Sequence, residues 1–497
     1  MTRFASGNLW VFVVALAAFV LLPLGSARAS DELDRFVQEE LSASGVPGIT
    51  YGAVIDGEIR AAQWGEVEKG SNTPVTAQTG FLAGSVTKSF TALAIMQLVD
   101  AGDVELDAPV STYLDIFADG APQAAITVRQ LLSHTSGYST LQGNMTHEGL
   151  ELSDAPLARR AQDIAALTPA HLPGDQWEYS NANYVLAGRV IETVSALSYA
   201  DYITQNVLIP AGMTNSFVNT GPRDPRLAIG HKPWLGSKRA IKADNTGTAN
   251  NEVSGSRSLA LAYAPQGGLV STGGDLALYL AMMMNGEDDL ITAQAKQLMM
   301  RPANDASPYY GLGWFLDPET GLVYHSGNSP GFEALASMIP AERKGAANMV
   351  NAASGIGFGE TGYLRSEVNA IALGLENDGV RAGWGPKSFY LMVMSGPLIF
   401  ILCMVWAWHH RAAIRAKTGP MRIVSIWLPL ITTSALAASV VLVVPRVFGA
   451  SLRTIYTFVP DMGLAMIGVA VLGVMWAVMR IVIAYTGPSS APRSDRA

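Results

Sequence analysis

The sequence contains one cysteine, Cys403, among 497 residues, and it lies inside an apolar run. A single thiol forms neither a disulfide framework nor a thiolate metal site, so disulfide-stapled folds and dithiol redox chemistry are excluded. The seven histidines include no His-x-x-x-His pair, which argues against a zinc peptidase of that type. We therefore expect no bound metal, and the chemistry inferred below needs no organic cofactor.

Charged residues are scarce as well, at 15%, whereas 49% of the residues are hydrophobic. This composition disfavours a disordered or nucleic-acid-binding protein and predicts that part of the chain lies in lipid. Ten Lys or Arg and two acids follow residue 383, so a charge of −16 before it and +8 after it make up the net −8. The basic tail indicates contact with anionic membrane lipid and no nucleic-acid partner.

The N-terminus has the form of an export signal. Arg3 precedes an apolar stretch over residues 9–24, and residues 27–30 (Ala-Arg-Ala-Ser) carry the small-x-small pattern that signal peptidase cleaves. We predict a signal peptide over residues 1–29, with an uncleaved first membrane anchor as the alternative. In either case the domain that follows is exported.

Three uncharged apolar segments near the C-terminus are long enough, at ~1.5 Å per residue, to cross the ~30 Å hydrocarbon core of a bilayer. These are residues 389–408, 423–444 and 462–479. The loop after the first carries four basic residues and no acid, so the positive-inside rule places it in the cytoplasm, together with a tail over residues 486–497. We predict three transmembrane helices within residues 384–485, in a bacterial inner membrane.

Residues 30–383 then form a domain on the periplasmic or extracellular side, long enough for two packed subdomains. Two β-rich runs, 49–55 and 58–64, are joined by Asp-Gly, the pair that tolerates a hairpin turn. Further strands are expected over residues 322–325, 334–339 and 346–351, with mostly helical patches between. This order predicts an α/β fold whose sheet is built from both ends of the domain around an all-α insertion.

A first chemical motif is Ser85-x-x-Lys88, at the start of an expected helix over residues 89–101 that ends at Gly102. Residues three apart share a helix face, so the Lys88 amine can lie beside the Ser85 hydroxyl and take its proton. Positive potential at the helix start would favour an oxyanion. Alone, the pattern is also that of a helix cap followed by a solvated lysine.

A second motif is Tyr179-Ser-Asn181, just before an expected helix over residues 185–194. A tyrosine near a lysine can be held as a phenolate and pass a proton to a leaving group, and a carboxamide can contact both substrate and lysine. A buried aromatic side chain and a helix cap are the alternatives.

A third motif covers His325, Ser326, Gly327 and Asn328, at the end of an expected strand. Glycine there lets the strand backbone approach a ligand closely, and the N–H of the next residue can point into the site. A strand-end turn with a surface histidine is the alternative.

With these three motifs the chain resembles the penicillin-recognising serine hydrolases, in the branch that holds class C β-lactamases, D-alanyl-D-alanine carboxypeptidases, D-aminopeptidases and related esterases. The resemblance spans roughly residues 33–375 and includes segments 131–137, 267–272 and 310–314. It implies the β-lactamase/transpeptidase-like fold, an antiparallel sheet flanked by helices, followed here by the transmembrane helices.

The resemblance also implies roles for individual residues. Ser85 would be the acylated nucleophile, Lys88 its proton acceptor, Tyr179 the base or acid of the second motif, and Asn181 a contact to substrate and lysine. The oxyanion would bind to the backbone N–H groups of Ser85 and Asn328.

Two further histidines are interpreted by the same resemblance. His325 stands where many members carry the lysine of Lys-Thr-Gly, which argues against strong recognition of a substrate carboxylate and hence against true β-lactamase activity. Ser326 and Gly327 complete that strand motif as substrate-binding positions. His134 is expected to be structural, because the motif needs no second base.

We thus expect a membrane-anchored serine hydrolase that cleaves an amide or ester of a peptide or small molecule through an acyl-enzyme. Peptides with D- or otherwise unusual residues are favoured by family analogy alone. Pocket-lining residues are expected mainly from the middle insertion and from residues 220–256. Two alternatives remain: a catalytically idle membrane-held sensor or scaffold, and an α/β-hydrolase that uses Ser329 in Gly-x-Ser-x-Gly.

Overall fold

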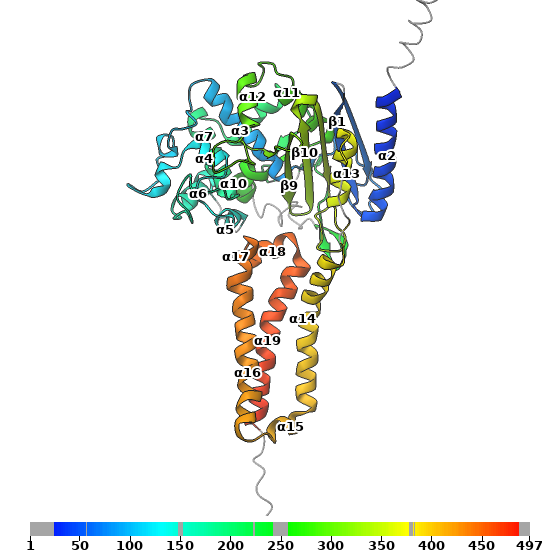
Figure 1. Ribbon diagram of the computed structural model, residues 1–497, viewed down its shortest axis with the longest axis vertical. Helices are drawn as coiled ribbons and strands as arrows, with labels where there is room; N and C mark the ends of the chain where they lie inside the picture. The colour runs from blue at the N-terminus through cyan, green and yellow to red at the C-terminus, as the bar shows by residue number, and fades with distance from the viewer. Residues whose placement is uncertain are drawn as a thin grey trace, which may run out of the picture.

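A six-stranded antiparallel sheet organises the larger part of the molecule (Figure 1). The computed structural model describes residues 24–55, 57–147, 153–221, 224–241, 257–376, 381 and 383–486. The sheet has the order β2-β1-β11-β10-β9-β8. Its strands are β1 (Gly48–Ile55), β2 (Glu58–Gly65), β8 (Phe315–Asp317), β9 (Leu322–Ser329), β10 (Phe332–Ile339) and β11 (Lys344–Val350). Because β1 pairs with β11, the two ends of the domain build one sheet, as predicted.

One strand is longer than its sequence pattern indicates. The expected strand over residues 322–325 continues as β9 to Ser329, because its ladder with β10 runs on to the pair of Ser329 with Phe332. The motif from His325 to Asn328 therefore lies inside a strand and not at its end.

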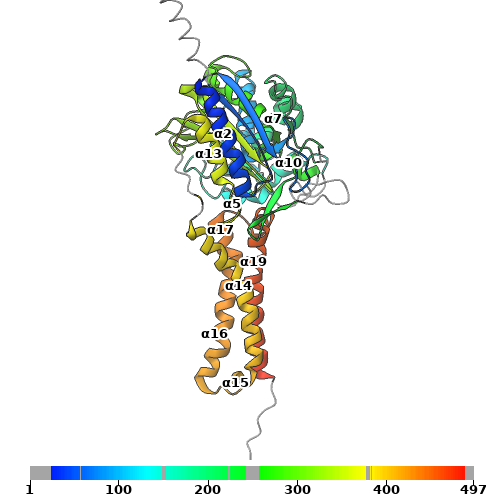
Figure 2. The same ribbon diagram turned by 90° about the vertical axis from the view of Figure 1, so that its right-hand side faces the viewer.

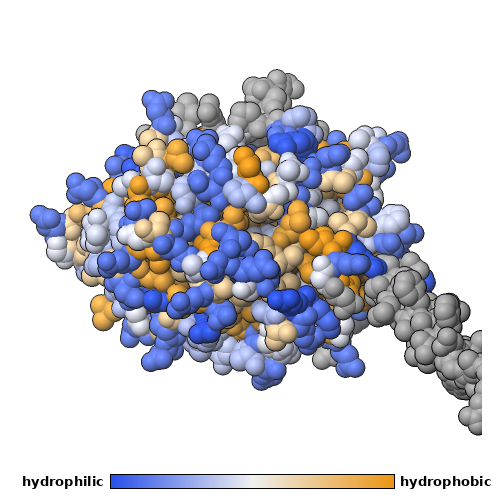
Figure 3. Space-filling view, turned by 90° about the horizontal axis from the view of Figure 1, so that it is seen from above, coloured by the Kyte–Doolittle hydropathy of each residue, from blue (hydrophilic) through white to orange (hydrophobic). Residues whose placement is uncertain are grey.

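Helices cover both faces of the sheet (Figure 2). On one face α2 (Leu24–Ser44) and α13 (Gly362–Leu373) enclose a small apolar core. On the other, α3 (Thr87–Asp100) and α11 (Gly273–Met284) belong to a larger core that continues into the helical insertion. The face of this domain that is turned away from the C-terminal helices carries mixed hydrophilic and apolar side chains (Figure 3).

The insertion consists mainly of short helices. They are α4 (Val128–Leu132), α5 (Thr140–Asn144), α6 (Pro156–Ala165), α7 (Asn181–Ser195), α8 (Tyr199–Ile203), α10 (Arg257–Gly267) and α12 (Ala293–Met299), with the single turns η1 (Gly84–Val86), η2 (Val110–Thr112), η3 (Pro122–Ala125) and η4 (Met145–His147) and the π-helical η5 (Thr204–Leu208). The turn η6 (Pro340–Glu342) lies outside the insertion and connects β10 to β11. Two small sheets join β3 (Phe81–Leu82), β7 (Leu269–Ser271) and β4 (Phe217–Val218), and β5 (His231–Trp234) with β6 (Ser237–Ala240). The predicted fold class is confirmed.

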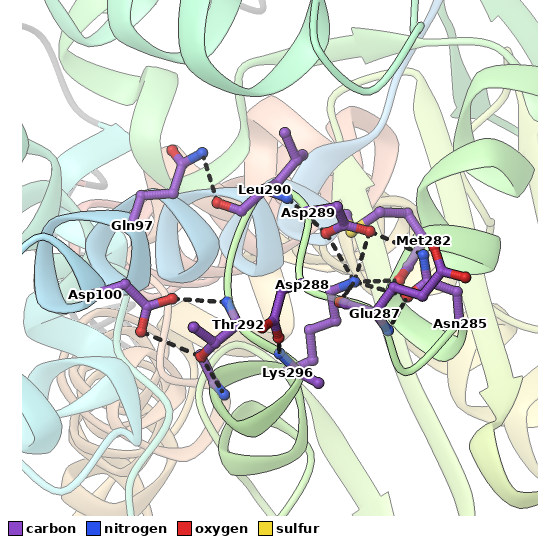
Figure 4. A network of polar contacts seen from close by, with 12 residues as sticks. Gln97, Asp100, Met282, Asn285, Glu287, Asp288, Asp289, Leu290, Thr292 and Lys296 are labelled. Atoms are coloured by element: carbon purple, nitrogen blue, oxygen red, sulfur yellow. Dashed lines mark hydrogen bonds and ion pairs between the residues drawn. The ribbon is translucent and has the colours of Figure 1, made fainter.

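A buried lysine orders the loop between α11 and α12 (Figure 4). Lys296 is 1% exposed, and its Nζ donates to the carbonyls of Met282 and Glu287, each at 2.9 Å. It also contacts Asn285 Oδ1 at 2.8 Å and Asp289 Oδ2 at 2.7 Å. Four acceptors replace the water that the ammonium loses on burial, so this charge holds the loop together.

Three long apolar helices follow the domain. They are α14 (Trp384–His409), α16 (Gly419–Ala438) with its continuation through η7 (Ser439–Val443) and α17 (Val444–Phe448), and α19 (Pro460–Tyr485); α15 (Arg411–Arg415) and α18 (Leu452–Phe458) connect them. Each is long and apolar enough to cross a membrane, and each extends beyond its predicted span. Most of the large apolar side chains on these helices are exposed at the surface of the described structure.

The domain sits on one end of this helix bundle, and the basic connection α15 lies at the other end (Figure 1). Asp461, at the start of α19, accepts hydrogen bonds from the backbone N–H of Leu235 at 2.8 Å and from the Tyr390 hydroxyl at 2.7 Å. Arg480 of α19 donates to the Ser425 carbonyl of α16 at 2.9 Å inside the bundle. Residues 1–23 of the predicted signal segment lie outside the described residues. Residues 487–497 of the predicted tail lie outside them as well.

Candidate active site

Ser85 lies in the turn η1, directly before α3, and Lys88 lies in the first turn of that helix. The Lys88 Nζ donates to Ser85 Oγ at 3.0 Å and to the Gln266 carbonyl at 2.7 Å. Lys88 has no exposed surface, and this burial holds its pKa well below the ordinary 10.5. A neutral amine beside a serine hydroxyl is a proton acceptor for that hydroxyl.

Tyr179 reaches the same serine from the loop before α7. Its hydroxyl is hydrogen-bonded with Ser85, and the Lys88 Nζ lies 5.1 Å from the centre of its ring. Burial raises the pKa of Tyr179 well above 10, so the group is a neutral phenol at physiological pH. Burial therefore opposes the phenolate that the second motif allows.

His134 fixes the loop that carries Tyr179. Its Nδ1 accepts from the Ser180 backbone N–H and from Asn183 Nδ2, both at 3.1 Å, and its ring centre lies 4.3 Å from that of Tyr179. Burial, with Lys88 and His325 nearby, lowers the pKa of His134 well below 6.5, so the ring is neutral. Its contacts are those of a positioning residue.

Strand β9 runs directly against η1, and two glycines allow this approach. A Cβ at Gly327 would lie 1.9 Å from the Ala83 carbonyl oxygen, and one at Gly84, whose φ is +52°, would lie 2.5 Å from the Asn328 nitrogen. Glycine is required at both positions because any side chain would separate the two backbones. The nitrogen of Asn328 is thereby brought to the turn that carries Ser85.

His325, Ser326 and Asn328 alternate across β9. His325 is 1% exposed and is bonded through Nε2 with the Tyr310 hydroxyl at 3.1 Å, whereas Ser326 and Asn328 lie on the exposed face. Burial and the nearby Lys88 lower the pKa of His325 to about 3, so this ring is neutral too. His325 therefore belongs to an aromatic layer beneath Tyr179 and adds no positive charge to the site.

Four of the residues expected at the site line one cavity of about 460 Å³: Ser85, Tyr179, Asn181 and Asn328. Lys88 lies behind Ser85 and contacts it. Among the residues that the structure describes, His325, Ser326 and Gly327 do not line this cavity. Asn144 joins this wall and accepts from Asn181 Nδ2 at 2.9 Å. The sequence analysis missed it, and no local pattern marked it.

The opposite wall of the cavity comes from the C-terminal helices. It includes Phe389 of α14, Ile455 and Phe458 of α18, and Met462 and Met466 of α19. This overturns the expectation that the middle insertion and residues 220–256 supply most of the lining, at least for the described residues. An apolar residue in a membrane helix looks the same in sequence whether it faces lipid or an active site.

The alternative nucleophile has a different setting. Ser329 is fully buried at the end of β9, and residues 330–331 form a turn into β10, so Gly-x-Ser-x-Gly lies in a β-hairpin here. A nucleophile elbow needs a strand followed by a helix. In the described part of the chain, no three His, Cys, Asp or Glu side chains cluster to hold a metal ion.

Residues 33–367 match the family model described as Beta-lactamase. The chain belongs to the beta-lactamase family of serine hydrolases. This confirms the resemblance found in the sequence. The family match ends before the three apolar helices begin, so those helices and their wall of the cavity lie outside it.

Curated relatives of the family cover only part of this chain. Protein flp of Staphylococcus aureus (strain N315) is 26% identical over 333 residues, which are 65% of this chain and 63% of that protein, so less than two thirds of its length is matched. Penicillin-binding protein 4 of Amycolatopsis lactamdurans is 32% identical over 197 residues, 39% of this chain and 50% of the relative.

Solved structures of the family superpose on the same region. The octameric penicillin-binding protein homologue from Pyrococcus abyssi has a TM-score of 0.57 and 27% identity, over 70% of this chain and 78% of its own. SurE, in a crystal structure with D-Leu, has a TM-score of 0.54 and 25% identity, over 72% and 78%. A class C beta-lactamase at 20% identity and a TM-score of 0.55, over 72% and 99%, shows the shared fold.

Proposed function

We propose that this protein is a membrane-anchored serine hydrolase that cleaves an amide or ester bond through an acyl-enzyme on Ser85. The observation that supports this most directly is the 3.0 Å contact between the Lys88 amine and the Ser85 hydroxyl. The lowered pKa of Lys88 favours the uncharged amine, which is the state that a general base needs.

In the acylation step, Lys88 takes the Ser85 proton while Oγ attacks the carbonyl carbon. The negative charge that develops on the carbonyl oxygen is stabilised by the backbone N–H groups of Ser85 and Asn328. The Tyr179 hydroxyl donates its proton to the amine or alcohol that leaves. The proton that Lys88 took from Ser85 then moves to Tyr179 and restores its hydroxyl. The neutral phenol suits this donor role.

In the deacylation step, a water molecule attacks the ester of Ser85 and passes a proton back through Tyr179 and Lys88. The acid is released, and the serine hydroxyl and the amine are restored. Asn181 and Asn144 present their carboxamides in the cavity wall, beside Asn328, and supply hydrogen bonds to the substrate backbone or headgroup.

The site faces the bundle end opposite the basic connection α15, which supports a place outside the cytoplasm under the positive-inside rule. Export by the signal segment over residues 1–29 and location in a bacterial inner membrane are part of the same proposal. Peptides with D- or unusual residues remain the favoured substrates from family analogy, and the binding of D-Leu by SurE is in line with this.

The proposal is tested by mapping an active-site adduct. The full-length protein, reconstituted in nanodiscs, is treated with a fluorophosphonate, and the modified peptide is identified by mass spectrometry. We expect the label on Ser85 and its loss in Ser85→Ala, with labelling retained in Ser329→Ala. An intact protein that takes up neither a fluorophosphonate nor a fluorescent penicillin would contradict the proposal and favour an idle membrane-held sensor or scaffold.

A further inference from the structure

The cavity at Ser85 is chemically divided. One end carries the polar groups of the hydrolase domain, with Ser85, Tyr179 and Asn328. The other end is an apolar wall formed by residues of α17, α18 and α19, which include Phe448, Ile455 and Met462. A substrate that fills this space presents a carbonyl at one end and a hydrocarbon portion at the other. Its volume of about 460 Å³ is within the usual range for a small-molecule site.

The apolar wall lies at the edge of the bilayer expected from the sequence. Phe389 and Met462 both line the cavity, and each is the first residue of an uncharged apolar run, 389–408 and 462–479. The wall therefore continues into the outward-facing apolar surface of α14 and α19. This placement suits a hydrocarbon chain that comes from the lipid.

A hydrogen-bonded chain holds the wall against the polar end of the site. Asn181 Nδ2 donates to Asn144 Oδ1 at 2.9 Å, and Asn144 Nδ2 donates to the Gly449 carbonyl at 2.7 Å. Gly449 belongs to the turn between α17 and α18, so one side chain links a predicted substrate-binding residue to the membrane helices. The two walls are thus one built site and not two surfaces that happen to face each other.

We infer that the substrate is a membrane-resident amphiphile, an amide or ester that carries an aliphatic chain. The chain lies against α18 and α19 while the carbonyl reaches Ser85. A wholly polar peptide would leave this apolar wall without a contact. An acylated substrate, in contrast, would expose its hydrocarbon chain to water if the wall were absent, at a large cost in free energy. The inference names the substrate class of the hydrolase and rests on the function proposed above.

The test uses matched esters and the full-length protein in nanodiscs. p-Nitrophenyl acetate and decanoate place the chain on the acyl side, and phenyl acetate and 4-decylphenyl acetate place it on the leaving group. For each pair kcat/KM is measured and expressed as the ratio of the long-chain to the short-chain ester. Comparing this ratio between variants in the same nanodiscs cancels the partition of the ester into lipid.

Ala450→Trp fills the apolar end of the cavity, because Ala450 lines it. We expect the ratio to fall about tenfold or more in at least one ester pair. The matched control Ala435→Trp adds the same bulk on an exposed face of α16 and should leave the ratio unchanged. Where Ala450→Trp does not fold, Ile455→Gln takes its place, with Ile431→Gln on an exposed position as its control.

The outcomes separate the two proposals. Ratios that stay at the wild-type value in both pairs, in a variant that still takes up a fluorophosphonate, overturn the inference and leave the serine hydrolase standing. Equal hydrolysis of the short-chain esters by wild type and Ser85→Ala overturns the proposed function itself.

Discussion

The beta-lactamase-family domain and the C-terminal helices bury polar side chains that have different roles. In the domain, Lys88, His134 and Lys296 are each at most 1% exposed. Their contacts with other elements position a reactive group or order a loop. In the helices most large side chains are apolar and face outward, and buried Asp461 fastens the bundle to the domain. One region is held by internal polar networks and the other is suited to lipid.

Both regions contribute residues to the candidate active site. The reactive groups come from the part of the chain that matches the family, and an apolar wall comes from helices outside that match. The same catalytic geometry can therefore serve a different substrate class when another structure is placed across it. The predictions below test the two regions separately.

The largest effect is expected from Lys88→Met, which removes the proton acceptor and keeps most of the volume. We expect kcat/KM for p-nitrophenyl acetate to fall on the order of 10³-fold. In the wild type the activity should fall as the pH drops, because protonated Lys88 accepts no proton, and this fall should lie well below pH 10.5. A Lys88→Met enzyme with a normal rate and pH profile would contradict the assignment.

Lys296→Met should destabilise the domain and leave the candidate active site at Ser85 unchanged. The substitution leaves two loop carbonyls and Asp289 without their cation, and we expect a loss of about 2–3 kcal/mol in the free energy of unfolding. Lys344→Met is the control, because Lys344 pairs with Glu342 at the surface. Thermal unfolding of the two variants measures this, and an equal shift in both would show that the Lys296 network stabilises the domain no more than the surface pair does.

Asp461→Ala should loosen the contact between the two regions. Two donors, the part-buried Leu235 N–H and the buried Tyr390 hydroxyl, lose their acceptor, at a cost of about 1–3 kcal/mol. We expect faster hydrogen exchange at the Leu235 amide and in α18, with no change in the exposed-site control Asp119→Ala. Unchanged exchange in Asp461→Ala would mean that the regions are held together by other contacts.

The smallest effect is expected from His325→Gln. We expect it in the pH dependence of the free energy of unfolding. The pKa of His325 is about 3 in the folded protein and ordinarily 6.5, so the unfolded chain binds the proton more readily between these values. Stability therefore falls as the pH drops through this window, by up to about 1.4 kcal/mol per pH unit. The variant should lose this part of the slope in thermal unfolding between pH 7 and 5, whereas His409→Gln, exposed at the far end of α14, should keep it.

Local patterns predicted much of this architecture. The i, i+3 spacing placed Lys88 beside Ser85, and the uncharged runs predicted the three apolar helices. Other features had no local signal. Asn144 and Ile455 look like ordinary loop and helix residues, and the extension of β9 to Ser329 depends on a ladder with β10. The roles assigned to Ser85, Lys88, Tyr179 and Asn181 stay predictions until an adduct is mapped.

The sequence by itself determined which groups can react and which segments suit a membrane, because both follow from residue type and short-range spacing. Only the tertiary structure decided that the pKa of Lys88 is lowered, since Lys88 is buried by distant parts of the chain, such as the Gln266 carbonyl 178 residues away. It also decided that α18 and α19 stand across the site, since that contact joins residues such as Asn144 and Gly449, 305 positions apart. Such long-range contacts depend on how whole elements pack, and no short stretch of sequence encodes them.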